Sequence, residues 1–457
     1  MRIDLNNKQV LVLGLGDTGL SASRWLRQHG ALLSVADTRE APPSLGILRA
    51  EMPETKVHLG AFRASVFASA EIIVVSPGVA IDGPMAEPQI QAAIKRGVPV
   101  VGDVELFAQY RSPQSKLIAI TGSNGKSTVT ALVGEMCKSA GLKTVVAGNI
   151  GLPVLDTLVE EIPDVYVLEL SSFQLETTNL LNADAATVLN ITEDHLDRYA
   201  GFADYAAAKA RIFEGSGVQV LNRQDLVSLG MAKTGRNQIT FGTDLPPTPD
   251  DFGIKHEHGD AWLMHGSTAL IKVSEMHIAG LHNAVNALAA LALCRALGLD
   301  FAPLLGALRN YKGLPHRVEL VAEINGVSFY DDSKGTNVGA TCAALAGLPQ
   351  KVVLIAGGDG KGQDFTPLRA AVKQNARAVV LIGRDGAQIG AVLKGTDIPL
   401  LNASSLEGAV QMAFNAAQSG DAVLLSPACA SFDMFKNYLH RAEVFVSAVH
   451  ALESAAL

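Results

Sequence analysis

The sequence predicts an α/β protein of three consecutive domains, each organised around a mostly parallel sheet. Three observations lead to this prediction. The chain has 457 residues, which corresponds to about three domains at roughly 150 residues each. Short apolar runs that end in glycine or serine alternate with helical stretches, the pattern of strand–helix–strand units. Polar breaks at 111–116 and 311–315 divide the chain, so we expect domains over residues 1–111, 112–313 and 314–457.

Composition excludes several classes of protein. Lysine and arginine number 37 against 45 aspartates and glutamates, so the net charge of −8 argues against a nucleic-acid-binding surface. The longest apolar stretch, residues 284–299, contains Asn286 and Arg295 and is too short for a bilayer, and no signal-peptide cleavage pattern follows the first apolar run. The cysteines are far apart: Cys137, Cys294, Cys342 and Cys429. We therefore expect no membrane insertion and a cytoplasmic, reducing location.

The first domain is predicted to be Rossmann-like. Strands are expected at 10–15, 32–36, 72–75 and 98–101, with helices at 18–29 and 89–96. Between the first strand and helix lies Gly14-Leu15-Gly16-Asp17-Thr18-Gly19, and Asp37 ends the next strand. This pattern is typical of dinucleotide binding, so an NAD-dependent oxidoreductase is one hypothesis. The same turn can hold any diphosphate-linked nucleotide, including a UDP group.

The second domain opens with the sharpest local signal in the chain. A strand at 117–121 runs into Thr121-Gly122-Ser123-Asn124-Gly125-Lys126-Ser127-Thr128, and a helix is expected from 129 to 140. Backbone N–H groups of such a loop surround phosphate oxygens, Lys126 reaches the β- and γ-phosphates, and Ser127 holds magnesium. The loop departs from the usual pattern because Ile120 stands where its first glycine is expected. The prediction is a P-loop mononucleotide-binding domain that holds a nucleoside triphosphate.

Three more side chains of this domain are candidates for the reaction centre. Glu169 ends a strand at 165–170, which favours a magnesium role, and His195 lies just past a strand at 186–190. By itself, His195 is equally compatible with a metal ligand and a surface histidine. Lys209 lies on the apolar face of a helix. It is either a lysine whose ammonium reaches solvent or a desolvated amine that adds carbon dioxide to become a carbamate, and local residues favour the former.

Residues 218–280 are rich in glycine and proline, so we expect a small β insertion or flank there, followed by a helix after His282. The last domain is predicted to be Rossmann-like. It opens with a hairpin, 319–324 and 327–330, around Asn325-Gly326, and continues with strands at 352–356, 378–382 and 422–425.

Polar clusters stand at the ends of these strands, where binding groups of α/β proteins gather. Arg317 precedes the hairpin and is suited to pair with a phosphate. Lys334, Lys361 and the Ser431 hydroxyl could together hold a carboxylate.

Taken together, TGSNGKST, LELSSFQLE, NITEDHLDRY, HNAVNALAALAL, GLPHRVE, DDSKGTN, GGDGKG and SPACASFDMF resemble the Mur ligase family over nearly the whole chain. Within that family, GLGDTG, SPG at 76–78 and the SPACAS ending resemble the members that join D-glutamate to UDP-N-acetylmuramoyl-L-alanine. The resemblance implies an ATP-dependent, ADP-forming amide ligase of peptidoglycan precursor synthesis, which acts through an acyl phosphate. It implies a cytoplasmic enzyme, and a monomer is expected.

The resemblance also assigns roles to residues. The UDP-linked substrate is expected to contact Asp17, Thr18, Asp37, Thr38, Arg39, Ser76, Gly78, Asn149 and Gln174. ATP is expected to contact Gly122, Asn124, Gly125, Lys126, Ser127, Thr128, Asn283, Arg317 and Asp332. One magnesium ion would be held by Ser127 and Glu169 and a second by His195 and a carbamylated Lys209. At Lys209 the resemblance therefore favours the carbamate, whereas the neighbouring residues alone favoured an ammonium that reaches solvent. D-Glutamate is expected to contact Lys334, Thr336, Lys361, Ser431, Phe432 and Tyr438. Lys126, His195 and Lys209 are the expected catalytic residues.

Two other classes of function stay open on the residues alone. The first is the NAD-dependent oxidoreductase already described. The second is a nucleotide-gated binding protein that carries out no chemistry.

Overall fold

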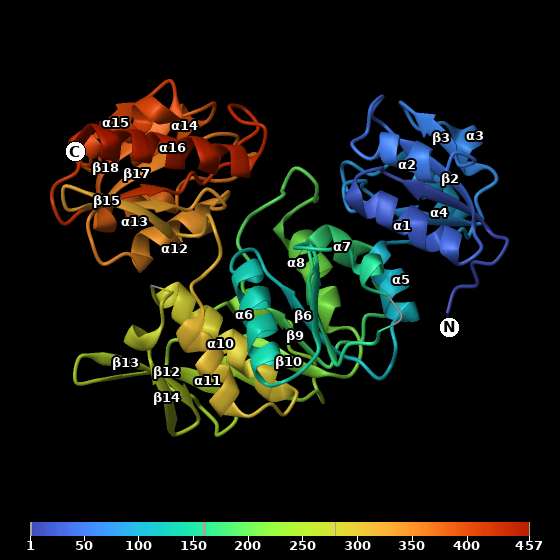
Figure 1. The fold of residues 1–457 in the computed structure, drawn as a ribbon, viewed down its shortest axis with the longest axis horizontal. Coiled ribbons are helices and arrows are strands. Elements are labelled where there is room, and N and C mark those ends of the chain that lie inside the picture. The colour runs from blue at the N-terminus through green and yellow to red at the C-terminus, as the bar shows by residue number, and fades with distance from the viewer. Residues whose placement is uncertain (1, 159–160, 279, 457) are drawn as a thin grey trace.

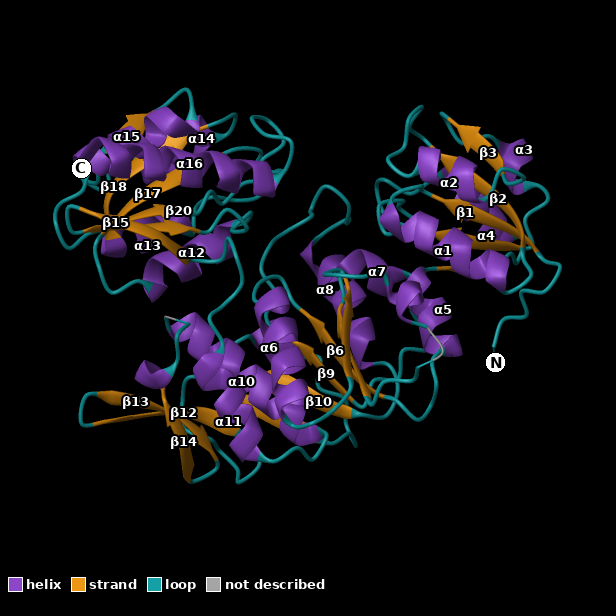
Figure 2. Cartoon of the chain, viewed as in Figure 1, coloured by secondary structure: helices purple, strands orange, loops and turns teal. Residues whose placement is uncertain are grey.

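The computed structural model describes residues 2–158, 161–278 and 280–456. Three sheets with parallel pairing follow one another along the chain, and a small antiparallel sheet flanks the second. Figure 1 shows the first sheet at the right, the second below it and the last at the upper left, and Figure 2 shows that helices cover these sheets. The predicted α/β class with three parallel sheets is confirmed.

The first sheet has the strand order β3-β2-β1-β4-β5. Its strands are β1 (Gln9–Leu13), β2 (Leu32–Asp37), β3 (Lys56–Leu59), β4 (Ile72–Val75) and β5 (Val100–Val101). Its helices are α1 (Asp17–Gln28), α2 (Leu45–Glu51), α3 (Ala64–Phe67), α4 (Pro88–Lys95) and α5 (Asp103–Tyr110). All its strand pairs are parallel, with β1 between β2 and β4. The turn after β1 therefore lies at the carboxyl edge of the sheet, beside the ends of β2 and β4.

The second sheet has the order β11-β10-β9-β6-β8-β7. Its strands are β6 (Lys116–Thr121), β7 (Thr144–Gly148), β8 (Val165–Glu169), β9 (Ala185–Val188), β10 (Val218–Asn222) and β11 (Gln238–Phe241). The helices around it are α6 (Lys126–Ser139), α7 (Ser172–Glu176), α8 (Phe202–Ala210), α9 (Leu226–Leu229), α10 (Leu281–Ala296) and α11 (Phe301–Asn310), with 3-10 turns at Val154–Thr157, Arg211–Phe213 and Val273–Glu275. Both β6 and α10 are buried in the core, and this fixes the loop that joins β6 to α6.

The expectation of a β insertion over residues 218–280 is only partly correct. The first part, β10 and β11, extends the central parallel sheet, with β10 beside β9. Only β12 (Phe252–Glu257), β13 (Asp260–His265) and β14 (Thr268–Lys272) form a separate antiparallel sheet. Short strands joined by glycine-rich and proline-rich turns look alike in sequence whichever sheet they join, because pairing partners lie far away in the chain.

The last sheet has the order β15-β16-β20-β17-β18-β19, and only its hairpin pair is antiparallel. Its strands are β15 (Glu319–Ile324), β16 (Val327–Asp331), β17 (Val352–Gly357), β18 (Ala376–Ile382), β19 (Leu400–Asn402) and β20 (Ala422–Leu425). Its helices are α12 (Val338–Gly347), α13 (Leu368–Asn375), α14 (Gly386–Leu393), α15 (Leu406–Ala416) and α16 (Tyr438–Ala456). The predicted Asn325-Gly326 hairpin is confirmed, and both residues have a positive φ.

Among the described helices, none combines the length and the apolar character that a membrane crossing requires.

Candidate active site

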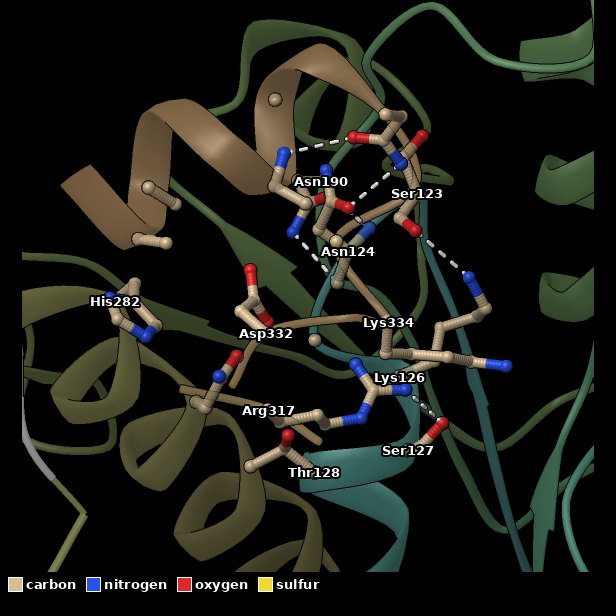
Figure 3. Close-up of a pocket in the computed structure, with 18 of the residues that line it drawn as sticks. Ser123, Asn124, Lys126, Ser127, Thr128, Asn190, His282, Arg317, Asp332 and Lys334 are labelled. Atoms are coloured by element: carbon tan, nitrogen blue, oxygen red, sulfur yellow. Dashed lines mark hydrogen bonds between the residues drawn. The ribbon is translucent and has the colours of Figure 1, made fainter. Parts of the chain in front are cut away.

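A pocket with a volume of about 510 Å³, called the larger pocket below, is lined by residues of both the central and the last domain. Its walls combine the loop before α6, the end of β8, the start of α10 and the loops around β16 and α12. Figure 3 shows side chains from both sheets converging on it. Of the predicted site residues, it is lined by Asn124, Gly125, Lys126, Ser127, Thr128, Asn149, Glu169, His195, Asn283, Arg317, Asp332, Lys334, Thr336 and Lys361.

The loop before α6 is shaped as a phosphate cradle. Gly125 has φ of +81°, and a Cβ there would stand 2.5 Å from the amide oxygen of Asn286, so a side chain would clash. Lys126 turns its amine back on the loop and donates to the carbonyls of Gly122, at 2.8 Å, and Ser123, at 2.9 Å. Burial lowers the pKa of Lys126. A bound phosphate would give this half-buried ammonium an ionic partner.

Glu169 faces the same loop from the end of β8. One carboxylate oxygen accepts from the Asn149 amide at 2.7 Å, while Oε2 is buried and has no hydrogen-bond partner in the described structure. The residue is 2% exposed. A buried carboxylate oxygen without a partner is costly unless a cation or donor reaches it. Oxygen ligands of this kind are those that magnesium prefers, so the residues present fit the predicted ion.

Lys209 lies on α8, behind the cradle. Its amine donates to the Gly122 carbonyl at 2.9 Å and to the Thr121 hydroxyl at 3.3 Å, and the residue is 2% exposed. The alternative in which its ammonium reaches solvent is therefore wrong. Burial, reinforced by the charge of Lys126, lowers the pKa of Lys209 well below its usual value. A neutral amine is the form that adds carbon dioxide.

His195 and Asp194 occupy the loop after β9. The His195 Nε2 lies 3.6 Å from an Asp194 oxygen, and the other Asp194 oxygen lies 3.5 Å from the amine of Lys361. Burial lowers the pKa of His195 although Asp194 opposes the shift, which favours the neutral, metal-ligating imidazole. The sequence analysis missed Asp194, although it stands next to His195 in the chain.

Two polar contacts join the last domain to the cradle. The Arg317 guanidinium donates to the Ser127 hydroxyl at 2.7 Å, as Figure 3 shows, and the Asn337 amide donates to the Asn124 side-chain oxygen at 3.0 Å. We call this pair of contacts the seam. Because both bonds end on the predicted phosphate cradle, the last domain is held directly against it.

The last domain also contributes groups with shifted pKa values. Burial raises the pKa of Asp332 to about 7, although Ser426 donates to its carboxylate at 2.7 Å. Burial, reinforced by Arg317, lowers the pKa of Lys334 to about 8, and its amine lies 3.8 Å from the centre of the Tyr438 ring. Both groups therefore change charge near neutral pH.

The predicted D-glutamate residues are gathered only in part. Lys334, Thr336 and Lys361 line the larger pocket, whereas the other three predicted residues do not. Of these, Ser431 is buried, Phe432 is 72% exposed, and Tyr438 reaches the pocket only through Lys334. These three lie on the loop after β20 and at the start of α16, so the predicted D-glutamate residues are divided between the larger pocket and this neighbouring segment.

A smaller pocket of about 500 Å³ lies over the turn after β1. All of the predicted UDP-substrate residues line it: Asp17, Thr18, Asp37, Thr38, Arg39, Ser76, Gly78, Asn149 and Gln174. The Asp37 carboxylate accepts the Leu15 N–H at 2.7 Å and pairs with Arg39 at 2.7 Å. Burial opposes ionisation of Asp37, but the Arg39 bond and the backbone donors lower its pKa. Asn149 lines both pockets, so the two are adjacent.

The structure adds pocket residues that the sequence analysis missed. Asn286 follows Asn283 by three residues on α10, and its amide donates to the Asn283 side-chain oxygen at 3.2 Å. Helical spacing could have identified it. The Nδ1 atom of the half-buried His282 has no hydrogen-bond partner among the described residues, and desolvation lowers the pKa of His282 to about 4. Nothing in the local sequence separates His282 from an ordinary helix residue.

Three domain families match the chain. The description "Mur ligase MurD-like, N-terminal domain" applies to residues 8–102, "Mur ligase middle domain" to residues 120–294, and "Mur ligase, glutamate ligase domain" to residues 316–429.

Relatives match over the full length. A UDP-N-acetylmuramoylalanine–D-glutamate ligase of Methylobacillus flagellatus is 65% identical over 99% of this chain and 98% of its own. The enzyme of the same name from Nitrosospira multiformis is 54% identical over 99% and 97%.

Solved structures show the same fold. A pseudomurein peptide ligase type C from Methanothermus fervidus superposes with a TM-score of 0.61 at 18% identity, over 98% of this chain and 100% of its own. The MurF ligase of Thermotoga maritima, solved in complex with ADP, gives a TM-score of 0.60 at 17% identity, over 98% and 96%.

Proposed function

The chain belongs to the Mur ligase family, and from that premise we propose that it joins D-glutamate to UDP-N-acetylmuramoyl-L-alanine at the expense of ATP, in peptidoglycan precursor synthesis. The observation that supports this most is the pair of adjacent pockets. One holds the half-buried Lys126 on a phosphate cradle, and the other lies on a second glycine-rich turn without a lysine among its lining residues. A substrate held by its UDP group in the smaller pocket can extend past Asn149 towards the cradle.

Each domain then has one task. Residues 1–111 bind the UDP group, residues 112–313 bind ATP, and residues 314–457 bind D-glutamate and complete the ATP site. In the smaller pocket, the turn after β1 and the Ser76–Gly78 loop face the diphosphate and nucleoside. Asn149 and Gln174 face the sugar portion of the substrate because they lie on the side of that pocket formed by the central domain.

The first chemical step is phosphoryl transfer. A carboxylate oxygen of the L-alanyl group attacks the γ-phosphorus of ATP, the bond to the β-phosphate oxygen breaks, and ADP leaves with that electron pair. Lys126 stabilises charge on the transferring group, and Arg317 supplies a second cation from the last domain. The product is an acyl phosphate, whose phosphate is a good leaving group.

The second step forms the amide. The D-glutamate amine attacks the acyl carbon, loses a proton, and the tetrahedral intermediate collapses with loss of phosphate. The chain's cationic groups Lys334 and Lys361 are placed to hold the D-glutamate carboxylates at the same pocket. Ser431, Phe432 and Tyr438 complete this site when the loop after β20 closes on it, which also shelters the acyl phosphate from water.

Two magnesium ions fit the donors that line the larger pocket taken together with Lys209, which lies behind the cradle. Ser127 and Glu169 would hold one, and His195 with a carbamylated Lys209 would hold the other. When bound, the ions would neutralise phosphate charge during transfer. The unpartnered Glu169 oxygen and the buried, pKa-lowered Lys209 amine support these roles. Carbamylation would turn the Lys209 amine into an anionic oxygen donor, in addition to the Asp194 carboxylate that lies beside His195.

Phosphate release tests the proposal. Purified protein with ATP and magnesium should release phosphate only when UDP-N-acetylmuramoyl-L-alanine and D-glutamate are both present, with equimolar amide product. Release that does not need D-glutamate, or none with both substrates, contradicts it. Replacing D-glutamate in turn with L-glutamate, D-aspartate and L-lysine defines the acceptor.

The same assay separates the two other classes of function. An oxidoreductase requires nicotinamide binding at the first domain, so competition by UDP without NAD binding excludes it. A nucleotide-gated binding protein forms no amide, so product formation excludes that class.

A further inference from the structure

Arg198 makes an unusual set of contacts for a charged side chain. It lies in the loop after β9, three residues beyond His195, and its side chain is 7% exposed. One end of the guanidinium donates to the Pro77 carbonyl at 2.9 Å and to the Val79 carbonyl at 3.3 Å. Both acceptors belong to the first domain, on the loop that lines the smaller pocket. Arg198 therefore crosses from the second domain to the first.

The other contacts of Arg198 lie in its own domain. The guanidinium pairs with the Glu176 carboxylate at 2.7 Å and lies 4.1 Å from the centre of the Phe173 ring. Glu176 also accepts from the Tyr199 hydroxyl at 2.6 Å. Both Phe173 and Glu176 belong to α7, the helix that presents Gln174 to the smaller pocket. One buried guanidinium thus fixes the loop on one side of this pocket to the helix on the other.

Arg198 is also tied to the larger pocket, by its backbone N–H and by the Phe173 ring that its guanidinium covers. The Arg198 N–H donates to the His195 carbonyl at 2.9 Å, and the His195 ring packs edge-on against Phe173 with ring centres 4.8 Å apart. His195 has φ of +56°, so its placement depends on such neighbours. Displacing Arg198 would therefore disturb both the Ser76–Val79 loop and the histidine of the reaction centre.

The free-energy cost of burying the Arg198 guanidinium indicates a role beyond stabilising the fold. Burying a guanidinium is costly, and replacing buried ion pairs by apolar residues is often neutral or stabilising. Here Nε is buried without a partner in the described structure, so the cost is not fully offset. A function that needs the two pockets at a fixed separation accounts for keeping the charge.

We infer that Arg198 is a positioning residue that sets the relative placement of the two pockets, so that a substrate anchored in the smaller one presents its carboxylate to the cradle in the larger one. This inference rests on the proposed function, because it concerns how one substrate spans both pockets. Arg198 lines neither pocket, so it acts through the Ser76–Val79 loop, α7 and His195.

Steady-state kinetics of Arg198→Met test the inference. We expect the KM for UDP-N-acetylmuramoyl-L-alanine to rise about tenfold and kcat to fall about tenfold, consistent with loss of charge-assisted hydrogen bonds. The KM for ATP should change less than twofold. Arg198→Lys should not restore these constants, since one ammonium cannot reach acceptors on both domains.

Arg236→Met is the matched control. Its guanidinium also donates to backbone carbonyls, those of Gly217 at 3.0 Å and Phe213 at 3.0 Å, but only within the central domain and away from both pockets. We expect its kinetic constants to stay within twofold of those of the wild type. If Arg198→Met lowers the melting temperature as Arg236→Met does but leaves its kinetic constants unchanged, Arg198 is merely structural and the inference is wrong.

Hydrogen–deuterium exchange gives a readout that needs no catalysis. Arg198→Met should raise exchange over residues 76–83, and Arg236→Met should not. Unchanged exchange in Arg198→Met overturns the inference. If the wild type fails to make product, the proposed function is wrong, while the exchange comparison still decides whether Arg198 holds this loop.

Discussion

The two glycine-rich turns of this chain have the same local design and different surroundings. The turn after β1 leads into α1, and the turn after β6 leads into α6. Beside the first, Asp37 and Arg39 form an ion pair with no net charge. Beside the second, the half-buried Lys126 and the buried Lys209 both donate to the Gly122 carbonyl. The comparison indicates that either turn can hold an anion, while the two lysines suit the second turn to the proposed phosphoryl transfer.

Removing the charge of Lys126 is expected to have the largest effect. In Lys126→Met, phosphate release should fall by about a thousandfold, because the transferring phosphoryl group loses its main cation. UDP binding at the first turn, measured by calorimetry, should not change. Lys138→Met on the same helix is the control, since Lys138 pairs only with Glu135 on the surface. Substantial activity in Lys126→Met would mean that the two turns do not differ as proposed.

Lys209, the second lysine beside the turn after β6, should be replaceable in part by an added carboxylic acid. We expect Lys209→Ala to lose activity by about a hundredfold, the loss typical of removing a group that supports a metal site. Acetate or another short carboxylic acid should restore part of it by standing in for the carbamate. Lys233→Ala, which removes a surface lysine paired with Glu214, should show neither effect. Full activity of Lys209→Ala would exclude the carbamate.

The pH dependence of D-glutamate binding should follow Lys334. Its pKa of about 8 means that the ammonium is present below that pH and is lost above it. The KM for D-glutamate should therefore rise about tenfold between pH 7 and pH 9, as the charged fraction falls. Lys334→Arg keeps the charge over this range and should give a flatter profile. The same rise in both proteins would assign the titration to another group.

The smallest effect is expected at the first turn. Asp37→Asn removes the charge that holds Arg39 and weakens the bond from the Leu15 N–H. We expect the KM for UDP-N-acetylmuramoyl-L-alanine to rise about fivefold, equivalent to about 1 kcal/mol, with kcat unchanged. Asp82→Asn, whose carboxylate meets only the neighbouring Gly83 N–H, is the control. A fall in kcat would show that this turn takes part in chemistry as well as binding.

Continuous apolar runs and glycine-rich turns made much of the fold predictable. The strand at Ile72–Val75 and the hairpin around Asn325-Gly326 match the structure because their signals are local. Short edge strands were missed, such as β3 and β19, since few apolar residues distinguish them from loops. The sheet to which β10 and β11 belong depends on partners distant in the chain.

The candidate site likewise divides into residues with a local sequence signal and residues whose role depends on distant parts of the chain. Lys126 and Glu169 were predicted because each follows a strand at its carboxyl end, and both line the larger pocket. The resemblance to a family was needed to choose between the two alternatives at Lys209. The position of Arg198 could not be predicted from sequence, because its acceptors lie more than a hundred residues earlier in the chain.

The seam has a consequence for the design of small molecules. Its bond between Asn124 and Asn337 joins two neutral amides, and such a bond contributes only about 1 kcal/mol. A compound that carries its own amide donor and acceptor can replace this bond at a small cost in free energy. It would then bind Asn124 of the cradle at one end and Asn337, just before α12, at the other. It would hold the two domains at one separation and halt turnover without resembling either nucleotide.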